Sequence, residues 1–397
     1  MRFFLLLAAL VFACGLARAE GEAASNASRA SAASAPTSSP AAAASGNASG
    51  PEITLRTSDF RAPPPPAPPK AWINVPRVAG RITAKDLGLV INTADPYSVE
   101  VGEFYAKARK LAPEQILRTE LPVVASLTPE QFHAFAEAVA EYFGPEIQAL
   151  ALAWTTPFAV GCNSITGALA MGYDAELCAR SCSPSRRSAY FETATTRPFN
   201  DLHMRPSMLL AARDVAMAKA MIRRGVASDH TLGLRGAPPV NAWFVTTNDK
   251  ARSVRSVLFP PAGLVRAAGI DVHTETTQAL EDVSRVLLYQ TGLVQVEKLD
   301  TIRWVPGALA DHLTSTGGQL VGGTQMSAIE WIASGATASY GTVSEPCNHL
   351  QKFPHPQILL LNYAQGSSAL EAYWKSVAWP QQGVFIGEPL AAPFAKR

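Results

Sequence analysis

A regular alternation of strand and helix signals near the start of the folded region constrains the architecture most. The run 87–92 is almost wholly apolar, which is typical of a strand buried on both faces of a sheet. Asp95-Pro96 predicts a capped helix start, and Thr128 to Gln131 predicts a second helix through a capping box. Strands are expected at 116–121 and 147–154. Short strand-helix-strand connections favour an α/β fold, a mainly parallel sheet flanked by helices.

The alternation continues through the rest of the chain without a second linker. We expect strands at 241–247, 270–276, 286–293, 304–312 and 384–387, helices at 208–224 and 367–377, and a helix capped by Asn248-Asp249 that runs through Arg255. One large α/β domain at 71–397 is favoured over two. A less regular excursion at about 155–206 is expected beside the carboxyl ends of the strands, where α/β folds place ligand crevices.

The first 70 residues predict export. Residues 1–19 combine a basic start, a short apolar run and Ala17-Arg18-Ala19 before Glu20, which indicates a secretory signal peptide. The alternative is a lipoprotein signal through Cys14, whose motif Phe12 fits poorly. Residues 20–70 are rich in Ala, Ser and Pro and predict a disordered linker. We expect a periplasmic or extracellular protein with no transmembrane segment after signal removal.

Four cysteines remain after signal removal. They are Cys162, Cys178, Cys182 and Cys347. An even number in an oxidising compartment favours disulfides, with three connectivities open. The alternative is a metal held by Cys178 and Cys182 with Cys162 and a histidine, because thiolates and imidazoles suit zinc.

The charge balance and the glycine pattern narrow the classes of partner. With 34 basic and 32 acidic residues the formal net charge is +2, so we expect neither nucleic acid nor acidic lipid as a partner. The glycine-rich segment 317–324 has neither the spacing of a dinucleotide fingerprint nor the ending of a phosphate-binding loop. We therefore predict no nucleotide and no cofactor.

The segment 304–346 carries the candidate chemistry. Asp311-His312 ends one predicted strand and Ser339 lies at the end of the next, with Glu345 beyond it. A serine nucleophile needs a base and a group that orients the base, and neighbouring ends of parallel strands can bring such residues together. Backbone N–H groups of Gly317-Gly318 and Gly335-Ala336 can serve an oxyanion. The alternative is a structural hydrogen-bonding pair at His312 and a turn residue at Ser339.

Cys347 offers a second nucleophile. A thiolate beside an imidazole is a stronger nucleophile than an alcohol, so Cys347 with His312 would form a cysteine-type dyad. The alternative is a disulfide from Cys347, for example to Cys162.

Five segments carry a resemblance to known proteins: INTADPYSVEVGEFYAKAR, CNSITGALAMGYD, DHLTSTGGQL, GATASYGTVSEPCNHLQKFPHP and GVFIGEPLAAPF. They are similar to segments of an uncharacterised family of secreted bacterial proteins that occur in exosortase-containing species. The resemblance covers most of 87–394. It implies an envelope or extracellular role by association.

A more distant resemblance runs to the gingipain and caspase clan of cysteine peptidases. These have an α/β sheet with a catalytic His at one strand end and a catalytic Cys at the end of the next, and the resemblance implies a caspase-like layered sandwich. His312 falls at the first position, and Ala338-Ser339 stands where Ala-Cys is expected. Leu313 also stands where Gly usually follows the His. These departures leave a serine-based hydrolase, a thiol relocated to Cys347, or a catalytically inactive scaffold.

The expected function is therefore that of an exported, peptidase-like hydrolase using His312 with Ser339 or Cys347, with Asp311 beside the histidine. The alternative is a non-catalytic binding or scaffold protein of the cell envelope. In that case the same crevice would hold a polypeptide or an envelope polysaccharide.

Overall fold

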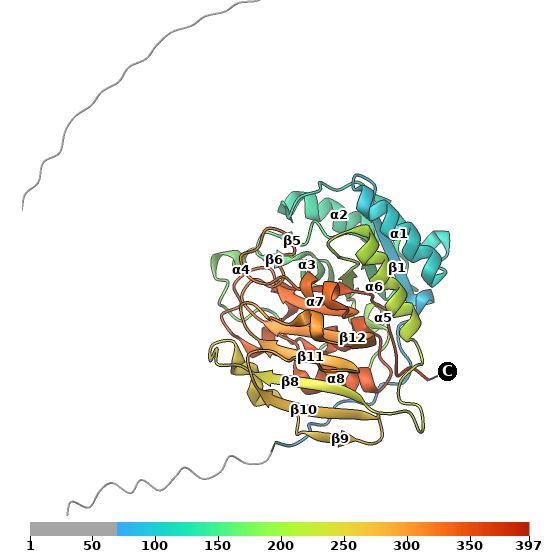
Figure 1. Ribbon diagram of the computed structural model, residues 1–397. Coiled ribbons are helices and arrows are strands. Elements are labelled where there is room, and N and C mark those ends of the chain that lie inside the picture. The colour runs from blue at the N-terminus through green and yellow to red at the C-terminus, as the bar shows by residue number, and fades with distance from the viewer. Residues whose placement is uncertain (1–69, 397) are drawn as a thin grey trace, which may run out of the picture. The chain divides into compact units, whose positions relative to one another are not determined.

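The computed structural model describes residues 70–396, so the predicted signal peptide and nearly all of the predicted linker lie outside it. These residues form an 11-stranded sheet in the order β2-β1-β4-β7-β14-β13-β12-β11-β8-β10-β9. Its strands are β1 (Leu87–Asn92), β2 (Ile116–Thr119), β4 (Ala149–Leu152), β7 (Ser207–Leu209), β8 (Val240–Thr246), β9 (Gly263–Val265), β10 (Ile270–Thr276), β11 (Val286–Gly292), β12 (Trp304–Leu313), β13 (Ala338–Thr342) and β14 (Gly383–Gly387). Figure 1 shows the order from β12 through β11, β8 and β10 to β9 at one edge.

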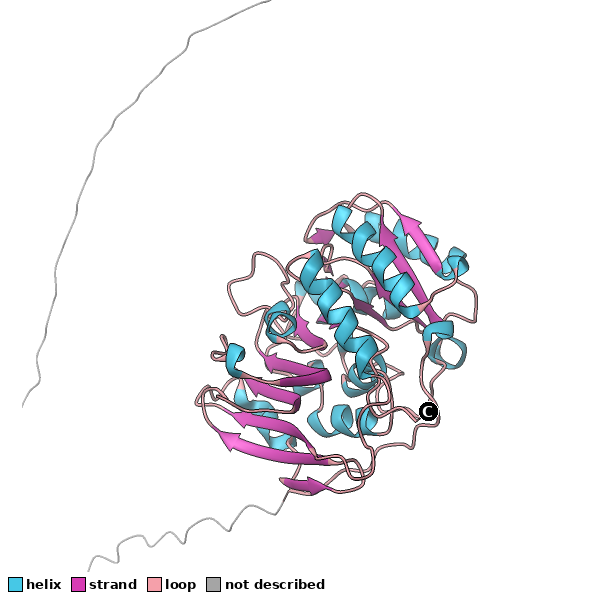
Figure 2. Cartoon of the chain, turned by 45° about the vertical axis from the view of Figure 1, so that its right-hand side comes forward, coloured by secondary structure: helices cyan, strands magenta, loops and turns pink. Residues whose placement is uncertain are grey.

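Helices lie in front of and behind the strands (Figure 2). They are α1 (Pro96–Arg109), α2 (Pro129–Tyr142), α3 (Ile165–Met171), α4 (Glu176–Ala179), α5 (Pro198–Leu202), α6 (Val215–Ser228), α7 (Ile329–Ser334), α8 (Pro356–Ala364) and α9 (Ala369–Ser376). Three short strands, β3 (Ser126–Leu127), β5 (Ala159–Val160) and β6 (Asn163–Ser164), form a separate small sheet. None of the helices described is long and apolar enough to cross a membrane.

Strand pairing confirms the predicted fold class. β1 pairs in parallel with β2 and β4, and β4 with β7. The run from β10 through β8, β11 and β12 to β13 is parallel as well. β9 runs antiparallel to β10, and β14 antiparallel to β13. The single register pair Ile386↔Leu209 joins β14 to β7. The predicted alternation of strand and helix therefore produces a mainly parallel α/β sheet.

The predicted helix starts are found where local chemistry supports them. Asp95 accepts a hydrogen bond from the N–H of Tyr97 at the start of α1, with Pro96 at the first helical position. Thr128 and Gln131 form the predicted capping box of α2.

Two predicted elements are wrong, and one helix was not predicted. The helix expected at 208–224 is the strand β7 followed by α6, because Met208 and Leu209 are buried in the sheet and Asp214 caps the helix. The helix expected to run through Arg255 is a short 3₁₀ helix at Ser253–Leu258. Helix α8 was not predicted; His355 caps it by accepting a hydrogen bond from the N–H of Ile358.

A buried ion cluster joins the end of β14 to two helices. Glu388, fully buried, accepts hydrogen bonds from Arg109 Nε at 2.9 Å and from the Tyr105 hydroxyl at 2.9 Å. Arg109 also binds Asp229, just beyond α6. α1, α6 and the last strand are thus connected through one guanidinium group. A carboxylate buried without this partner would keep its desolvation cost and lose the compensating charge.

We therefore expect Glu388→Gln to lower the free energy of unfolding by about 3 kcal/mol or more, the usual cost of breaking a buried pair. Glu103→Gln is the matched control, because Glu103 pairs with Arg118 while more than half of its side chain is exposed. That change should cost less than about 1 kcal/mol. Urea denaturation measures both. Equal losses would contradict a structural role for the Glu388 pair.

Candidate functional site

His312 and Ser339 lie on neighbouring parallel strands and share one face of the sheet. Leu309 of β12 is in register with Ala338 of β13, so Ser339 is level with Ala310, and His312 lies two residues further along. That offset separates the two Cα atoms by roughly 8 Å, given the rise per residue and the spacing of strands. The two residues therefore lie on adjacent strands, as expected from the sequence. They do not lie directly opposite one another.

A hydrogen bond from Trp331 determines the protonation of His312. Trp331, in α7, donates its indole N–H to His312 Nδ1 at 2.9 Å. The indole nitrogen is only a donor, so Nδ1 must be the unprotonated nitrogen of a neutral ring and Nε2 must carry the proton. His312 Nε2 has no hydrogen-bond partner of good geometry within residues 70–396. In this tautomer neither nitrogen is free to accept a proton from a serine hydroxyl.

The surroundings of His312 also oppose its positive charge. Its side chain is buried on the face formed by Trp331, Tyr289 and Met326. Burial lowers the pKa of His312 to about 3, and the charge of Arg255 adds to this shift, while the backbone carbonyl of Met326 opposes it in part. A general base works best with a pKa near the operating pH. His312 is therefore a poor base in this environment.

Ser339 is fully buried, and its hydroxyl has no hydrogen-bond partner in the part of the chain described. No hydrogen bond joins it to His312, because both His312 Nε2 and Ser339 Oγ are unpaired and His312 Nδ1 is occupied by Trp331. Four cavities among residues 70–396 are lined by other residues. The catalytic pairing of His312 with Ser339 stays a prediction of the sequence that these contacts do not support.

Asp311 faces the opposite side of the sheet from His312, because successive side chains of a strand alternate. Its carboxylate is buried and pairs with Arg255, which extends from the 3₁₀ helix after β8. Gln290 of β11 donates its side-chain N–H to the same carboxylate at 2.8 Å. Asp311 therefore binds Arg255 and Gln290 and does not orient the imidazole next to it in the sequence.

Three of the four backbone N–H groups considered for an oxyanion site already have partners. Gly318 N–H donates to the carbonyl of Thr342, Gly335 N–H to that of Ile332, and Ala336 N–H to that of Trp331. A Cβ atom on Gly341 would lie 2.4 Å from the backbone of Gly317. A Cβ atom on Gly318 would lie 2.5 Å from the carbonyl oxygen of Gly341, so Gly318 and Gly341 allow two segments of backbone to pack closely.

Both disulfides lie in or against the excursion at 155–206. Cys162 is bonded to Cys178, and Cys182 to Cys347, with Cα atoms 5.1 Å apart in each pair. The prediction of disulfides is confirmed, and the example pairing of Cys347 with Cys162 is wrong. The thiolate role of Cys347 is also wrong for this oxidised chain, because its sulfur is bonded. A metal site on these thiols is excluded for the same reason, and residues 70–396 contain no other group of three metal-binding side chains.

The structure instead shows an open cleft beyond the carboxyl ends of β1, β4 and β7. It has a volume of about 380 Å³ and is lined by Asp95, Tyr97, Val123, Thr155, Thr156, Ala212, Arg213, Leu320, Val321, Ile329 and Glu330. Val123 and Val321 are 52% and 55% exposed at its rim. The sequence predicts a crevice at strand ends but does not identify these residues. The signal that the sequence offered was the apolar pair Val123-Val124 directly after the strand predicted at 116–121, and both side chains are exposed in the structure.

Most polar side chains of the cleft are paired within the protein. The Tyr97 hydroxyl donates to the carbonyl of Leu210 at 2.8 Å, and that of Thr155 to the carbonyl of Ala212 at 2.9 Å. Arg213 forms an ion pair with Glu330 at the start of α7. Burial raises the pKa of Tyr97 well above its usual value, so the phenol stays neutral. The surface left for a ligand therefore combines the exposed apolar side chains of Val123 and Val321 with the partly exposed Arg213–Glu330 pair.

Neither a protein-family model nor the sequence of a curated protein matches the chain. Among solved structures, the Arg-specific cysteine proteinase gingipain R is similar, with 9% sequence identity over 78% of each chain and a TM-score of 0.45. Neither an activity nor a site residue is carried over from it.

The buried neutral histidine predicts a specific dependence of stability on pH. The unfolded chain binds a proton at His312 below about pH 6.5, whereas the folded chain does so only near pH 3, so stability is lost as the pH falls through this window. Each pH unit contributes about 1.4 kcal/mol, or about 3 kcal/mol between pH 6.5 and pH 4. The variant His312→Asn has no imidazole at this position, so its free energy of unfolding lacks this dependence on pH.

Urea denaturation of wild type and His312→Asn at several pH values tests this expectation. The free energy of unfolding of wild type should fall relative to that of the variant by about 3 kcal/mol between pH 6.5 and pH 4. Other acidic groups titrate in both proteins and cancel in the difference. A difference that stays constant with pH would show that His312 titrates normally.

Proposed function

We propose that this protein is a non-catalytic binding protein that holds a polypeptide segment in the cleft lined by Val123 and Val321. The hydrogen bond from Trp331 to His312 Nδ1 is the observation that carries the proposal. It favours a tautomer that accepts no proton from Ser339, and thus removes the base that a serine hydrolase requires. Together with the disulfide at Cys347, it leaves neither predicted nucleophile activated.

Burial adds to the argument against catalysis. Ser339 and His312 are 0% and 1% exposed, so a substrate would reach them only if α7 or the segment 314–328 moved. Such a movement would also have to break the bond to Trp331 before His312 could act as a base. A hydrolase thus requires two rearrangements, whereas binding in the cleft requires none.

A polypeptide fits the cleft better than a polysaccharide. Val123 and Val321 contribute exposed apolar surface, which favours burial of aliphatic side chains by about 25 cal/mol per Å². A sugar chain would bring hydroxyl groups that need partners, and the hydroxyls of Tyr97 and Thr155 already donate to backbone carbonyls. We therefore infer that the ligand presents apolar side chains to this surface.

The two disulfides support a site of action outside the cytoplasm. Disulfides persist in oxidising compartments, and Cys182–Cys347 connects segments 165 residues apart. This agrees with the secretory signal expected at residues 1–19. The proposed role is that of an exported protein that binds another polypeptide in the cell envelope or beyond it.

Selection of random displayed peptides on the purified full chain tests the function. Selected peptides should bind through the cleft, so Val321→Glu should weaken them about tenfold or more, because a charge then replaces an apolar contact. Val257→Glu is the matched control, since Val257 is 72% exposed and does not line the cleft. Fluorescence anisotropy gives the affinities.

Equal effects of the two valine variants, or no enriched peptide, would count against the cleft as the binding site. The same peptides should also remain intact after long incubation with the protein. Cleavage that disappears in both His312→Asn and Ser339→Ala would overturn the non-catalytic proposal.

A further inference from the structure

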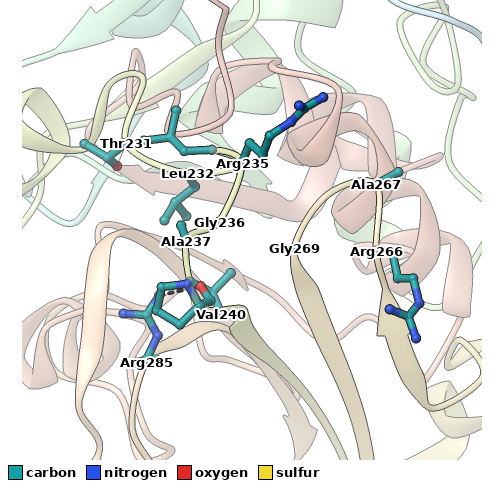
Figure 3. A pocket seen from close by; sticks show the side chains of 13 residues that line it. Thr231, Leu232, Arg235, Gly236, Ala237, Val240, Arg266, Ala267, Gly269 and Arg285 are labelled. Carbon is teal, nitrogen blue, oxygen red and sulfur yellow. Dashed lines mark hydrogen bonds between the residues drawn. The ribbon is translucent and has the colours of Figure 1, made fainter.

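A second hollow, separate from the cleft, lies at the amino ends of β8, β10 and β11. It has a volume of about 500 Å³. Its wall comes from the connection between α6 and β8, the turn between β9 and β10, and the residue before β11. It is lined by Thr231, Leu232, Gly233, Leu234, Arg235, Gly236, Ala237, Pro238, Val240, Arg266, Ala267, Gly269 and Arg285 (Figure 3).

The hollow has an unbalanced positive charge. Arg235, Arg266 and Arg285 are all exposed, and the 13 lining residues include no Asp or Glu. None of the three arginines takes part in an ion pair found within residues 70–396. Three unneutralised guanidinium groups around one concave surface attract anions, although the chain as a whole is nearly neutral.

One of these arginines is held in position by the protein. Arg285 donates from Nε to the carbonyl of Pro239 at 3.0 Å and from Nη2 to that of Pro238 at 2.9 Å. Its Nη1 group is left for a ligand. A guanidinium held by two backbone carbonyls loses less side-chain entropy on binding than a freely rotating one.

The arrangement of the charges indicates an extended ligand. Figure 3 shows the guanidinium groups of Arg235, Arg266 and Arg285 on different sides of the hollow, where they do not converge on one point. A single small anion needs converging donors, whereas a chain with several carboxylates can reach separated ones. Leu232 lies beside Arg235 and Ala237 lies between Arg235 and Arg285, and both supply apolar surface (Figure 3). A Cβ at Gly236 or Gly269 would meet no atom within 4 Å, so the backbone there is open to a ligand.

We propose that this hollow binds an acidic polypeptide segment in which carboxylate side chains alternate with aliphatic ones. Arginine forks match carboxylates through paired hydrogen bonds, and the leucine and alanine surface accepts the aliphatic residues between them. The lining has no aromatic side chain on which a sugar ring could stack. This site is independent of the cleft and of the role proposed for it.

Fluorescence anisotropy of the full chain with a labelled Glu-Leu repeat peptide, blocked at both ends, tests the proposal at low salt. The peptide should bind, and Arg235→Gln and Arg266→Gln should each weaken binding about fivefold, or about 25-fold together. Arg186→Gln is the control, because Arg186 is also exposed but does not line the hollow. Its binding should equal that of wild type.

Two further probes sharpen the test. A Gln-Leu repeat of the same length should bind at least tenfold more weakly, because it lacks the charges. Polygalacturonate, an acidic polysaccharide, should not displace the Glu-Leu peptide at equal carboxylate concentration. The proposal would be overturned if Arg186→Gln weakened binding of the Glu-Leu peptide as much as Arg235→Gln does. It would also be overturned if the Gln-Leu peptide bound as tightly as the Glu-Leu peptide, or if polygalacturonate displaced the Glu-Leu peptide.

Discussion

The buried pair of Arg255 and Asp311 holds together the part of the sheet that carries the candidate site. Arg255 binds the Asp311 carboxylate and donates to the carbonyls of Thr291 at 2.9 Å and of Pro354 at 3.4 Å. The carboxyl ends of β11 and β12 are thereby connected to the 3₁₀ helix after β8 and to the start of α8. Burying either charge alone would cost several kcal/mol, so these segments depend on the pair remaining intact.

The Arg255–Asp311 pair also affects His312, the residue that would act as the base in catalysis. Asp311 and His312 are adjacent in the sequence, but the alternation of a strand sends them to opposite faces. Asp311 is used by Arg255, and the pKa of His312 is lowered first by burial and further by the positive charge of Arg255. On the other face, Trp331 fixes the neutral imidazole. Asp311 and His312 resemble a catalytic pair in the sequence. In the structure Asp311 is bound to Arg255 on one face of the sheet, and His312 is bound to Trp331 on the other.

Local signals predicted the elements well where each residue's neighbours in the sequence decided its conformation. The cap at Asp95, the capping box at Thr128 and the apolar run of β1 are examples. The prediction of one helix at 208–224 was wrong because a three-residue strand is too short to show the alternating apolar pattern of a strand. Its apolar residues suit a helix equally well.

The candidate site was less predictable because its properties depend on distant contacts. The sequence located His312 and Ser339 on neighbouring strands, but nothing near them identified Trp331 as the donor to Nδ1. The cleft gathers residues from the ends of three strands and from the segment before α7, so no single segment carries its pattern. The tendency of α/β folds to bind ligands beyond the carboxyl ends of their strands predicted the region of the cleft. The residues that line it are determined by tertiary structure.

The tautomer of His312 tests the central claim most directly. Nitrogen NMR of the full chain with ring-labelled histidine, assigned with His312→Asn, reports which ring nitrogen carries the proton. We predict an unprotonated Nδ1 and a protonated Nε2 for His312, unchanged from neutral pH to about pH 5, because its pKa lies at about 3. A proton on Nδ1, or a titration near the ordinary pKa of histidine, would contradict the account and return His312 to the role of a base.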